Sequence, residues 1–259
     1  MIRRLACAAV CLVAFSIVRA EESATTAPST TPVIPTLPST LGPLGAVILF
    51  DGSNTDAWTT KEGGKPCPWK IVDEADAMEV VARSGDIISK QEFEDFQLHV
   101  EFWLPKNPPE VKGQARSNSG VYLQRRYEIQ ILDSYGQDAK KDGCGAIYNR
   151  KKPKENACTP PETWQAYDIT YKAAKFDEDG KKTSNARVTV IHNGVTIHQD
   201  AEIEGPTAAG QHEETPGPAP ILLQDHGNPV RFRNIWILPI KPEKAAGPTS
   251  RPAKVKQAE

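Results

Sequence analysis

Three polar side chains occur close together in an otherwise apolar segment, and their types are those of acid–base chemistry. They are Glu128, Gln130 and Asp133, within the run from Tyr127 to Tyr135. Carboxyl groups accept and donate protons, and an amide can hold a hydroxyl group, so such a row suits a groove that binds or cleaves a sugar. The alternative is an ordinary sheet face, on which Glu and Gln point toward water.

The residues around this row predict a β-hairpin that carries it on the second strand. Side chains alternate between the faces of a strand, so Glu128 and Gln130 share one face and the residues between them take the other. Strict alternation would place Asp133 on the wrong face. A one-residue β-bulge at Ile131–Leu132 would restore it, and bulges are common beside active sites.

A second polar cluster lies in a predicted turn between two apolar strands, at Gln224 to Asn228. His226 is an acid–base candidate because histidine titrates near neutral pH, and Asp225 could orient it. Both residues also have an ordinary explanation, since Asp-x-Gly turns are common and a single His often only donates a structural hydrogen bond.

Polar residues that flank these clusters are candidates for holding a ligand. The guanidinium of Arg125 or Arg231 can bind sugar oxygens through a planar fork of N–H donors. Arg231 alternates with apolar neighbours, so it faces away from the core and serves either a ligand or solubility. Asn118 precedes Ser119-Gly120 and fits either a turn or an amide that faces the site.

The elements that would position these residues are short strands separated by turn signals. We expect strands at 46–50, 69–72, 77–81, 87–88, 96–103, 121–132, 164–171, 188–192, 195–198, 221–223 and 230–238. Asn193-Gly194 between two of them is a strong hairpin signal. Because no segment of ten residues shows a helical period, and the chain has 22 Pro and 18 Gly, we predict an all-β, antiparallel β-sandwich or jelly roll.

The two ends of the chain differ in composition from its middle. Residues 1–20 have two arginines, a short apolar run and a small-residue end, which is typical of a secretory signal peptide. Residues 21–45 predict a disordered Ser/Thr/Pro-rich spacer, residues 46–240 a single folded domain and residues 241–259 a disordered tail. We therefore expect a periplasmic or secreted protein without a later membrane span.

The charge and the cysteine content of the chain indicate which ligands and which cross-links to expect. The net charge is −2, with 31 basic and 33 acidic residues, so no strong field favours nucleic acid or anionic lipid, and small neutral ligands fit best. After removal of the signal peptide three of the 5 cysteines remain, at positions 67, 144 and 158. We expect a disulfide between Cys144 and Cys158, with Cys67 free, and the alternative zinc site lacks a paired C-x-x-C spacing.

Two family resemblances meet at the first polar row. The spacing Glu-x-Gln-x-x-Asp resembles a degenerate form of the Glu-x-Asp-x-x-Glu strand of laminarinase-type glycosidases, which have a concanavalin-A-like fold. More specifically, residues from about 46 to 240 resemble the 3-keto-disaccharide hydrolase domain family. The matching motifs are Leu49–Gly52, Asn118–Leu123, Arg126–Gly136, Trp164–Asp168, His192–Gly194 and Leu223–Asn234.

The second resemblance implies cleavage of a small sugar or glycoside whose C3 hydroxyl has been oxidised to a ketone. A base near C2, an acid near the leaving group and donors for the sugar oxygens would then be needed. We expect His226, oriented by Asp225, or Glu128 as base, Asp133 as acid, and Arg125 and Gln130 on the sugar. Further substrate contacts would come from Asn118, Tyr122, Gln224 and Arg231.

No cofactor is firmly implied, although a divalent metal held by Glu128, or by Asp225 and His226, could polarise the ketone instead of an arginine. One alternative is an ordinary retaining glycosidase with Glu128 as nucleophile and Asp133 as acid. The other is a non-catalytic carbohydrate-binding module, which this fold often is.

Overall fold

The computed structural model describes residues 42–208, 210 and 213–241. The predicted signal peptide, nearly all of the predicted spacer and all but the first residue of the predicted tail lie outside the described residues. Within the described part of the chain, no helix is long and apolar enough to cross a bilayer.

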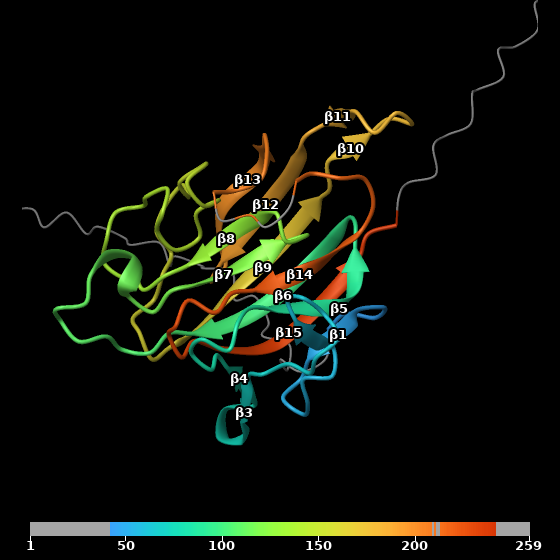
Figure 1. The fold of residues 1–259 in the computed structure, drawn as a ribbon. Helices are drawn as coiled ribbons and strands as arrows, with labels where there is room; N and C mark the ends of the chain where they lie inside the picture. The colour runs from blue at the N-terminus through green and yellow to red at the C-terminus, as the bar shows by residue number, and fades with distance from the viewer. Residues whose placement is uncertain (1–41, 209, 211–212, 242–259) are drawn as a thin grey trace, which may run out of the picture. The chain divides into compact units, whose positions relative to one another are not determined.

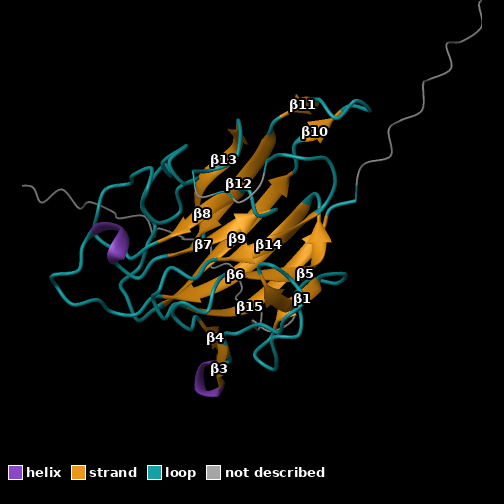
Figure 2. Ribbon diagram, in the orientation of Figure 1, coloured by secondary structure: helices purple, strands orange, loops and turns teal. Residues whose placement is uncertain are grey.

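Two antiparallel sheets form the domain (Figures 1 and 2). The larger has eight strands, and β1 pairs with β15 beside the main path. In spatial order it contains β13 (Val195–Ile203), β12 (Ala186–His192), β9 (Trp164–Lys172), β6 (Phe96–Trp103), β15 (Arg231–Pro239), β4 (Ala77–Glu79) and β3 (Lys70–Val72), together with β1 (Val47–Phe50).

The smaller sheet has five strands and carries the polar row. Its order is β2 (Trp58–Thr60), β5 (Ile87–Phe93), β14 (Ala219–Leu223), β7 (Ser119–Leu123) and β8 (Tyr127–Ile131). A separate hairpin is formed by β10 (Lys175–Phe176) and β11 (Lys182–Ser184), and two short 3-10 helices lie at η1 (Asp73–Ala75) and η2 (Gly113–Ala115). The predicted all-β antiparallel architecture is confirmed.

Alternating side chains from the two sheets make the core. On β6 the residues Phe96, Leu98, Val100 and Phe102 are buried, as their spacing predicts. Aromatic contacts join neighbouring strands of the larger sheet, with the rings of Phe102 and Tyr167 4.8 Å apart. The predicted hairpin turn at Asn193-Gly194 is present, and both residues have positive φ (52° and 82°), which a tight two-residue turn requires.

The outer face of the larger sheet carries a ladder of paired charges. Arg231 donates to Glu79 at 2.6 Å and lies over the Trp103 ring at 4.6 Å. Next to it, Arg233 donates to Glu101 at 2.7 Å. Arg231 therefore lies on the other sheet from Glu128 and cannot share its site, contrary to the prediction that it contacts the same ligand.

Two groups of this ladder have strongly shifted pKa values. Burial opposes charge on Glu101, but hydrogen bonds from His99, Asn234 and Arg233 outweigh it and lower the pKa of Glu101 to about 2. Burial likewise opposes charge on His99, but hydrogen bonds to Asp168 and Glu101 raise its pKa to about 9. Both groups are therefore charged at neutral pH and stabilise each other.

Candidate active site

The β7–β8 hairpin places the polar row on the outer face of the smaller sheet. Its turn is tight, because Gln124 and Arg125 both have positive φ (52° and 60°). Tyr122 pairs with Glu128 and Gly120 with Gln130. The side chains of Glu128, Gln130 and Tyr122 therefore share the face away from the sandwich core, as the alternation predicts.

Although this face points away from the core, it is covered. The side chains of Glu128 and Gln130 are only 2% and 1% exposed, so the alternative of a solvated sheet face is wrong. One cover is the segment after β8: the Gly145 N–H donates to the Gln130 carbonyl at 2.8 Å, and the Tyr148 N–H donates to the Glu128 carbonyl at 3.1 Å. This segment thus extends the sheet beyond β8.

The other cover is Gln114 in η2, a residue that no sequence pattern selects. Its Oε1 accepts from Gln130 Nε2 and from Asn118 Nδ2, each at 3.0 Å. Asn118 is thereby placed beside Gln130, as expected of a site-facing amide. Gln114 thus binds the amide nitrogens of Gln130 and Asn118, and the amide oxygens of these two residues point elsewhere.

Glu128 has an unusual environment for a buried carboxyl. Burial raises its pKa to about 7, the negative charge of Asp86 adds to this, and a hydrogen bond from Tyr122 opposes it. The Tyr122 hydroxyl in turn accepts from Gln224 Nε2 at 2.8 Å. Gln224 thus holds the phenol that lowers the pKa of Glu128.

Other buried or partly buried carboxyls of the described chain have basic partners. Glu79 and Glu101 contact arginines, Asp133 contacts Arg116, and Glu214 contacts Lys182. The interactions that set the pKa of Glu128 involve a phenol and a second carboxyl instead. Glu128 is therefore present in both its protonated and its ionised form near pH 7, which suits a group that exchanges protons.

Four oxygens around this carboxyl have no hydrogen-bond partner among the described residues, and three of their residues are almost fully buried. They are Glu128 Oε2, Gln130 Oε1, Asn118 Oδ1 and Gln224 Oε1. Buried acceptors normally have a donor. A ligand that carries several hydroxyl groups would supply such donors.

A groove of about 630 Å³ lies on the same face of the sheet, lined by Thr59, Ile88, Pro220 and Arg125 among others. Ile88 also packs with Tyr122 and Leu222, so the groove adjoins the Glu128 cluster. Its volume is within the usual range for small-molecule sites. Arg125 is half-buried at this groove, and burial lowers its pKa while the charges of Glu62 and Asp86 oppose the change.

Asp86 is a second residue near the site that the sequence analysis does not select. It lies directly before β5, where Gly85-Asp86 resembles an ordinary turn. Its Oδ1 accepts the Asp225 N–H at 2.9 Å and its Oδ2 contacts Lys61 at 3.3 Å. Asp86, and not Asp133, is the second carboxyl that acts electrostatically on Glu128.

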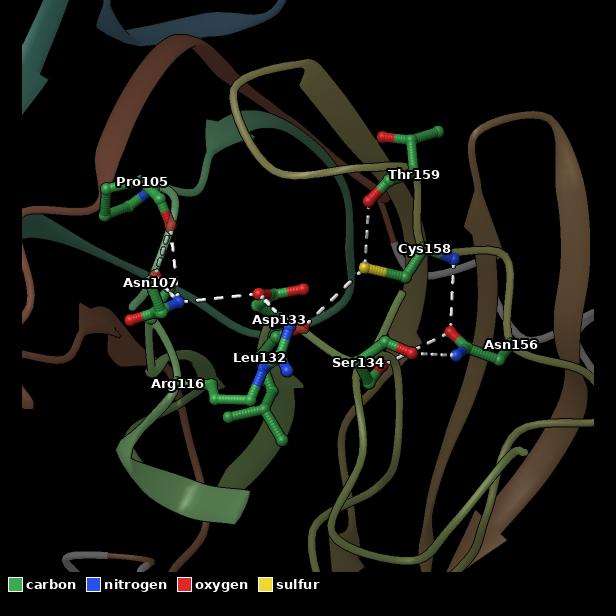
Figure 3. A network of polar contacts seen from close by, with 10 residues as sticks. Pro105, Asn107, Arg116, Leu132, Asp133, Ser134, Asn156, Cys158 and Thr159 are labelled. Atoms are coloured by element: carbon green, nitrogen blue, oxygen red, sulfur yellow. Dashed lines mark hydrogen bonds and ion pairs between the residues drawn. The ribbon is translucent and has the colours of Figure 1, made fainter. Parts of the chain in front are cut away.

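Asp133 has a different position from the one predicted (Figure 3). Strand β8 ends at Ile131, and the chain turns so that the Ser134 N–H donates to the Leu132 carbonyl at 2.8 Å. The Asp133 carboxyl accepts from Arg116 at 2.5 Å and from Asn107 at 3.4 Å. An end of the strand followed by a turn replaces the predicted bulge, and Asp133 ties the end of the strand to the segment that contains Gln114.

Asp225 does not orient His226 in the way that we predicted. Its two carboxyl oxygens accept the N–H groups of Gly227 at 2.8 Å and Gly85 at 2.9 Å. His226 is exposed at a shallow hollow lined also by Arg83. Asp225 therefore stabilises the turn and holds the segment before Asp86, while His226 takes part in neither contact.

Two further expectations concern a disulfide and a metal site. Cys67, Cys144 and Cys158 are free thiols in the structure, so the predicted disulfide is not formed there. Among the described residues, no three His, Cys, Asp or Glu side chains lie together as a metal-binding group. The donor set around Glu128, or around Asp225 and His226, thus does not match a metal site.

Comparison with known proteins gives the family. Residues 45–238 match the sequence model of the 3-keto-alpha-glucoside-1,2-lyase-like domain family. The chain belongs to this family. The predicted membership is confirmed, and the polar hairpin, Asp86 and the groove all lie within the matched residues.

Solved structures agree with this membership. A candidate glycosyl hydrolase from Parabacteroides distasonis is 39% identical over 76% of this chain and 84% of its own, with a TM-score of 0.69. Two others from the same organism share the fold at 19% and 21% identity, with TM-scores of 0.58 and 0.51. They cover 76% and 75% of this chain, and 94% and 99% of their own. A search of curated proteins finds no match.

The packing around Gly120 gives a first test of this site. A Cβ at position 120 would lie 2.6 Å from Glu128 Oε1 and 2.9 Å from Tyr122 Cε2, so Gly120→Ala must displace both side chains. We expect it to lower the free energy of unfolding by about 1–3 kcal/mol in urea denaturation. Gly205→Ala is the control, because nothing lies within 4 Å of its Cβ; equal losses in both variants would contradict the packing described.

A second test compares two buried glutamates. The folded pKa of Glu128 is raised, so its stability cost is absent below pH 4.5 and grows as pH rises through 7. Glu128→Gln should therefore increase the free energy of unfolding at pH 8, by on the order of 1–3 kcal/mol, with the gain fading toward pH 4.5.

Glu101→Gln supplies the opposite control. The folded pKa of Glu101 is lowered to about 2, so its stabilisation is present above pH 4.5 and is lost as pH falls through 2. This variant should be less stable than the wild type at pH 8. Destabilisation by both substitutions would show that Glu128 is an ordinary paired carboxylate.

Proposed function

We propose that this protein cleaves the glycosidic bond of 3-keto-glycosides, with Glu128 as the base that removes the proton from C2 of the oxidised sugar. The observation that carries the proposal is the buried Glu128 carboxyl with a pKa of about 7. A general base works best when its pKa is near the working pH. Membership of the 3-keto-alpha-glucoside-1,2-lyase-like family supports the substrate class.

The chemistry follows from the ketone. A carbonyl at C3 acidifies the hydrogen on C2, so Glu128 can take this proton while the C2–H electron pair forms the enolate. The enolate then expels the aglycone from C1, and the protonated Glu128 returns its proton to the leaving oxygen. Addition of water across the resulting C1=C2 bond completes a net hydrolysis, and a lyase would release the unsaturated sugar instead.

The surrounding residues have roles in binding. The free oxygens of Gln130, Asn118 and Gln224 accept hydrogen bonds from sugar hydroxyls. Tyr122 holds the Glu128 carboxyl through its hydrogen bond. Arg125, at the adjoining groove, is the cationic donor for the enolate oxygen.

An ordinary retaining glycosidase is the second candidate, and Asp86 is the observation that favours it. Its charge acts on Glu128, so the two carboxyls could serve as nucleophile and acid, in place of the pair Glu128 and Asp133. That mechanism needs carboxyls about 5–5.5 Å apart. A non-catalytic binding module has no use for a carboxyl whose pKa is raised to neutrality, which ranks it third.

The test is the rate of aglycone release from a 3-keto-glucoside and from its unoxidised parent. We expect the keto substrate to react at least about 100-fold faster, and kcat/KM to rise with pH through about 7 as Glu128 ionises. Glu128→Gln should reduce turnover by about 10²- to 10⁴-fold. Equal rates on both substrates, with Asp86→Asn as damaging as Glu128→Gln, would favour the retaining glycosidase, and binding without cleavage would favour the module.

His226→Ala is the informative companion variant. The exposed position of His226 predicts that its loss changes turnover far less than Glu128→Gln. A loss as large as that of Glu128→Gln would restore His226 as the base.

A further inference from the structure

Cys144 and Cys158 lie side by side beneath the end of β8. They are 2% and 7% exposed, and each thiol acts on the other: Cys158 raises the pKa of Cys144, and Cys144 lowers the pKa of Cys158. Cys158 Sγ lies 3.7 Å from the Leu132 carbonyl oxygen (Figure 3), and the Cys144 N–H donates to Ser134 Oγ at 3.3 Å. The two sulfurs thus occupy one small region although 13 residues separate them in the chain.

The residues between the two cysteines include the cover of the site. Gly145 and Ala146 are hydrogen-bonded to the backbone of Gln130, and Tyr148 to that of Glu128. At the far end Asn156 donates to the Ser134 carbonyl at 2.6 Å and accepts the Cys158 N–H at 3.2 Å. The two cysteines therefore stand at the base of the segment that extends the sheet beside the polar row.

Cys144 has a further connection to β8. The Tyr167 hydroxyl contacts Cys144 Sγ at 3.1 Å and donates to the Gln130 carbonyl at 2.7 Å. Tyr167 therefore connects the Cys144 sulfur to the strand that carries Glu128.

We propose that Cys144 and Cys158 form a disulfide that closes residues 145–157 into a covalent loop and fixes the cover of the site against β8. The spacing of the two cysteines predicts such a pairing, and the structure adds their shared position at Leu132 and Ser134 and the segment that the bridge would hold. The bond forms by exchange with a small disulfide such as glutathione disulfide.

The exchange has two steps. The Cys158 thiolate attacks one sulfur of the small disulfide and releases one thiol, and the Cys144 thiolate then displaces the second thiol. The protein loses two protons and two electrons, and the small disulfide is reduced to two thiols. The signal peptide predicted at residues 1–20 would deliver the chain to a compartment where such bonds persist.

The order of attack follows from the environment of each thiol. Cys158 is the more exposed, and the hydrogen bond from Cys144 lowers its pKa. Burial raises the pKa of Cys144. Cys67 instead lines the groove with Thr55 and Pro66, so among the cysteines of the described residues it remains the single free thiol.

The experiment compares protein refolded with glutathione disulfide and protein kept in dithiothreitol. After denaturation without reduction, we expect label on Cys67 in the oxidised sample, label on Cys67, Cys144 and Cys158 in the reduced one, and a Cys144–Cys158 peptide by mass spectrometry. The oxidised form should melt roughly 5–10 °C higher. Amide exchange at Gly145 and Tyr148 should be slower in it.

Two variants complete the design. Cys67→Ser should keep the difference in melting temperature, and Cys144→Ser with Cys158→Ser should abolish it. Label on all three thiols after oxidation, or a bridge that includes Cys67, would overturn the proposal. Because thiol content, melting and exchange need no substrate, a failure here is separate from a failure of the proposed activity.

Discussion

A carboxyl group buried beside a phenol and a second carboxyl is the constraint on which the site depends. Burial of Glu128 raises its pKa to about 7, and such burial costs stability that the rest of the domain must supply. The carboxyls of Glu79, Glu101, Asp133 and Glu214 show the usual solution, in which a basic side chain neutralises the charge. Glu128 differs, because the groups that act on its pKa are a phenol and a second carboxyl. This difference suits acid–base chemistry.

The sandwich makes this departure possible. The β7–β8 hairpin buries Val121, Leu123, Ile129 and other apolar residues on its inner face, which fixes the outer face without any contribution from Glu128. Segments on either side then cover the outer face, one through Gln114 and the other through the backbone of residues 145–148. The ion pair of Asp133 with Arg116 ties the first cover to the end of β8.

Regular alternation made much of this predictable. The inward residues of β6 and the shared face of Glu128 and Gln130 follow from a period of two, and Asn193-Gly194 encodes its own turn. The family motifs placed Asn118, Tyr122 and Gln224 near Glu128, and the structure brings them together. These features depend on local sequence or on one hairpin.

Contacts between distant segments were not predictable in this way. Gln114 and Asp86 lie in irregular stretches without a pattern, and only the folded chain brings them to Gln130 and Glu128. Asp133 was misplaced because a strand end and a bulge look alike in sequence, and Arg116, 17 residues away, decides between them. Arg231 was assigned to the site because it lies within a family motif, but its strand belongs to the other sheet.

The most direct measurement of the central claim is the pKa of Glu128 itself. Side-chain carboxyl ¹³C shifts of glutamate-labelled protein, titrated by NMR and assigned by comparison with Glu128→Gln, would give it without any substrate. We predict a carboxyl that titrates near pH 7 and is missing from the variant. A midpoint for Glu128 at or below 4.5 would contradict the account, because the group would then be a solvated or ion-paired carboxylate.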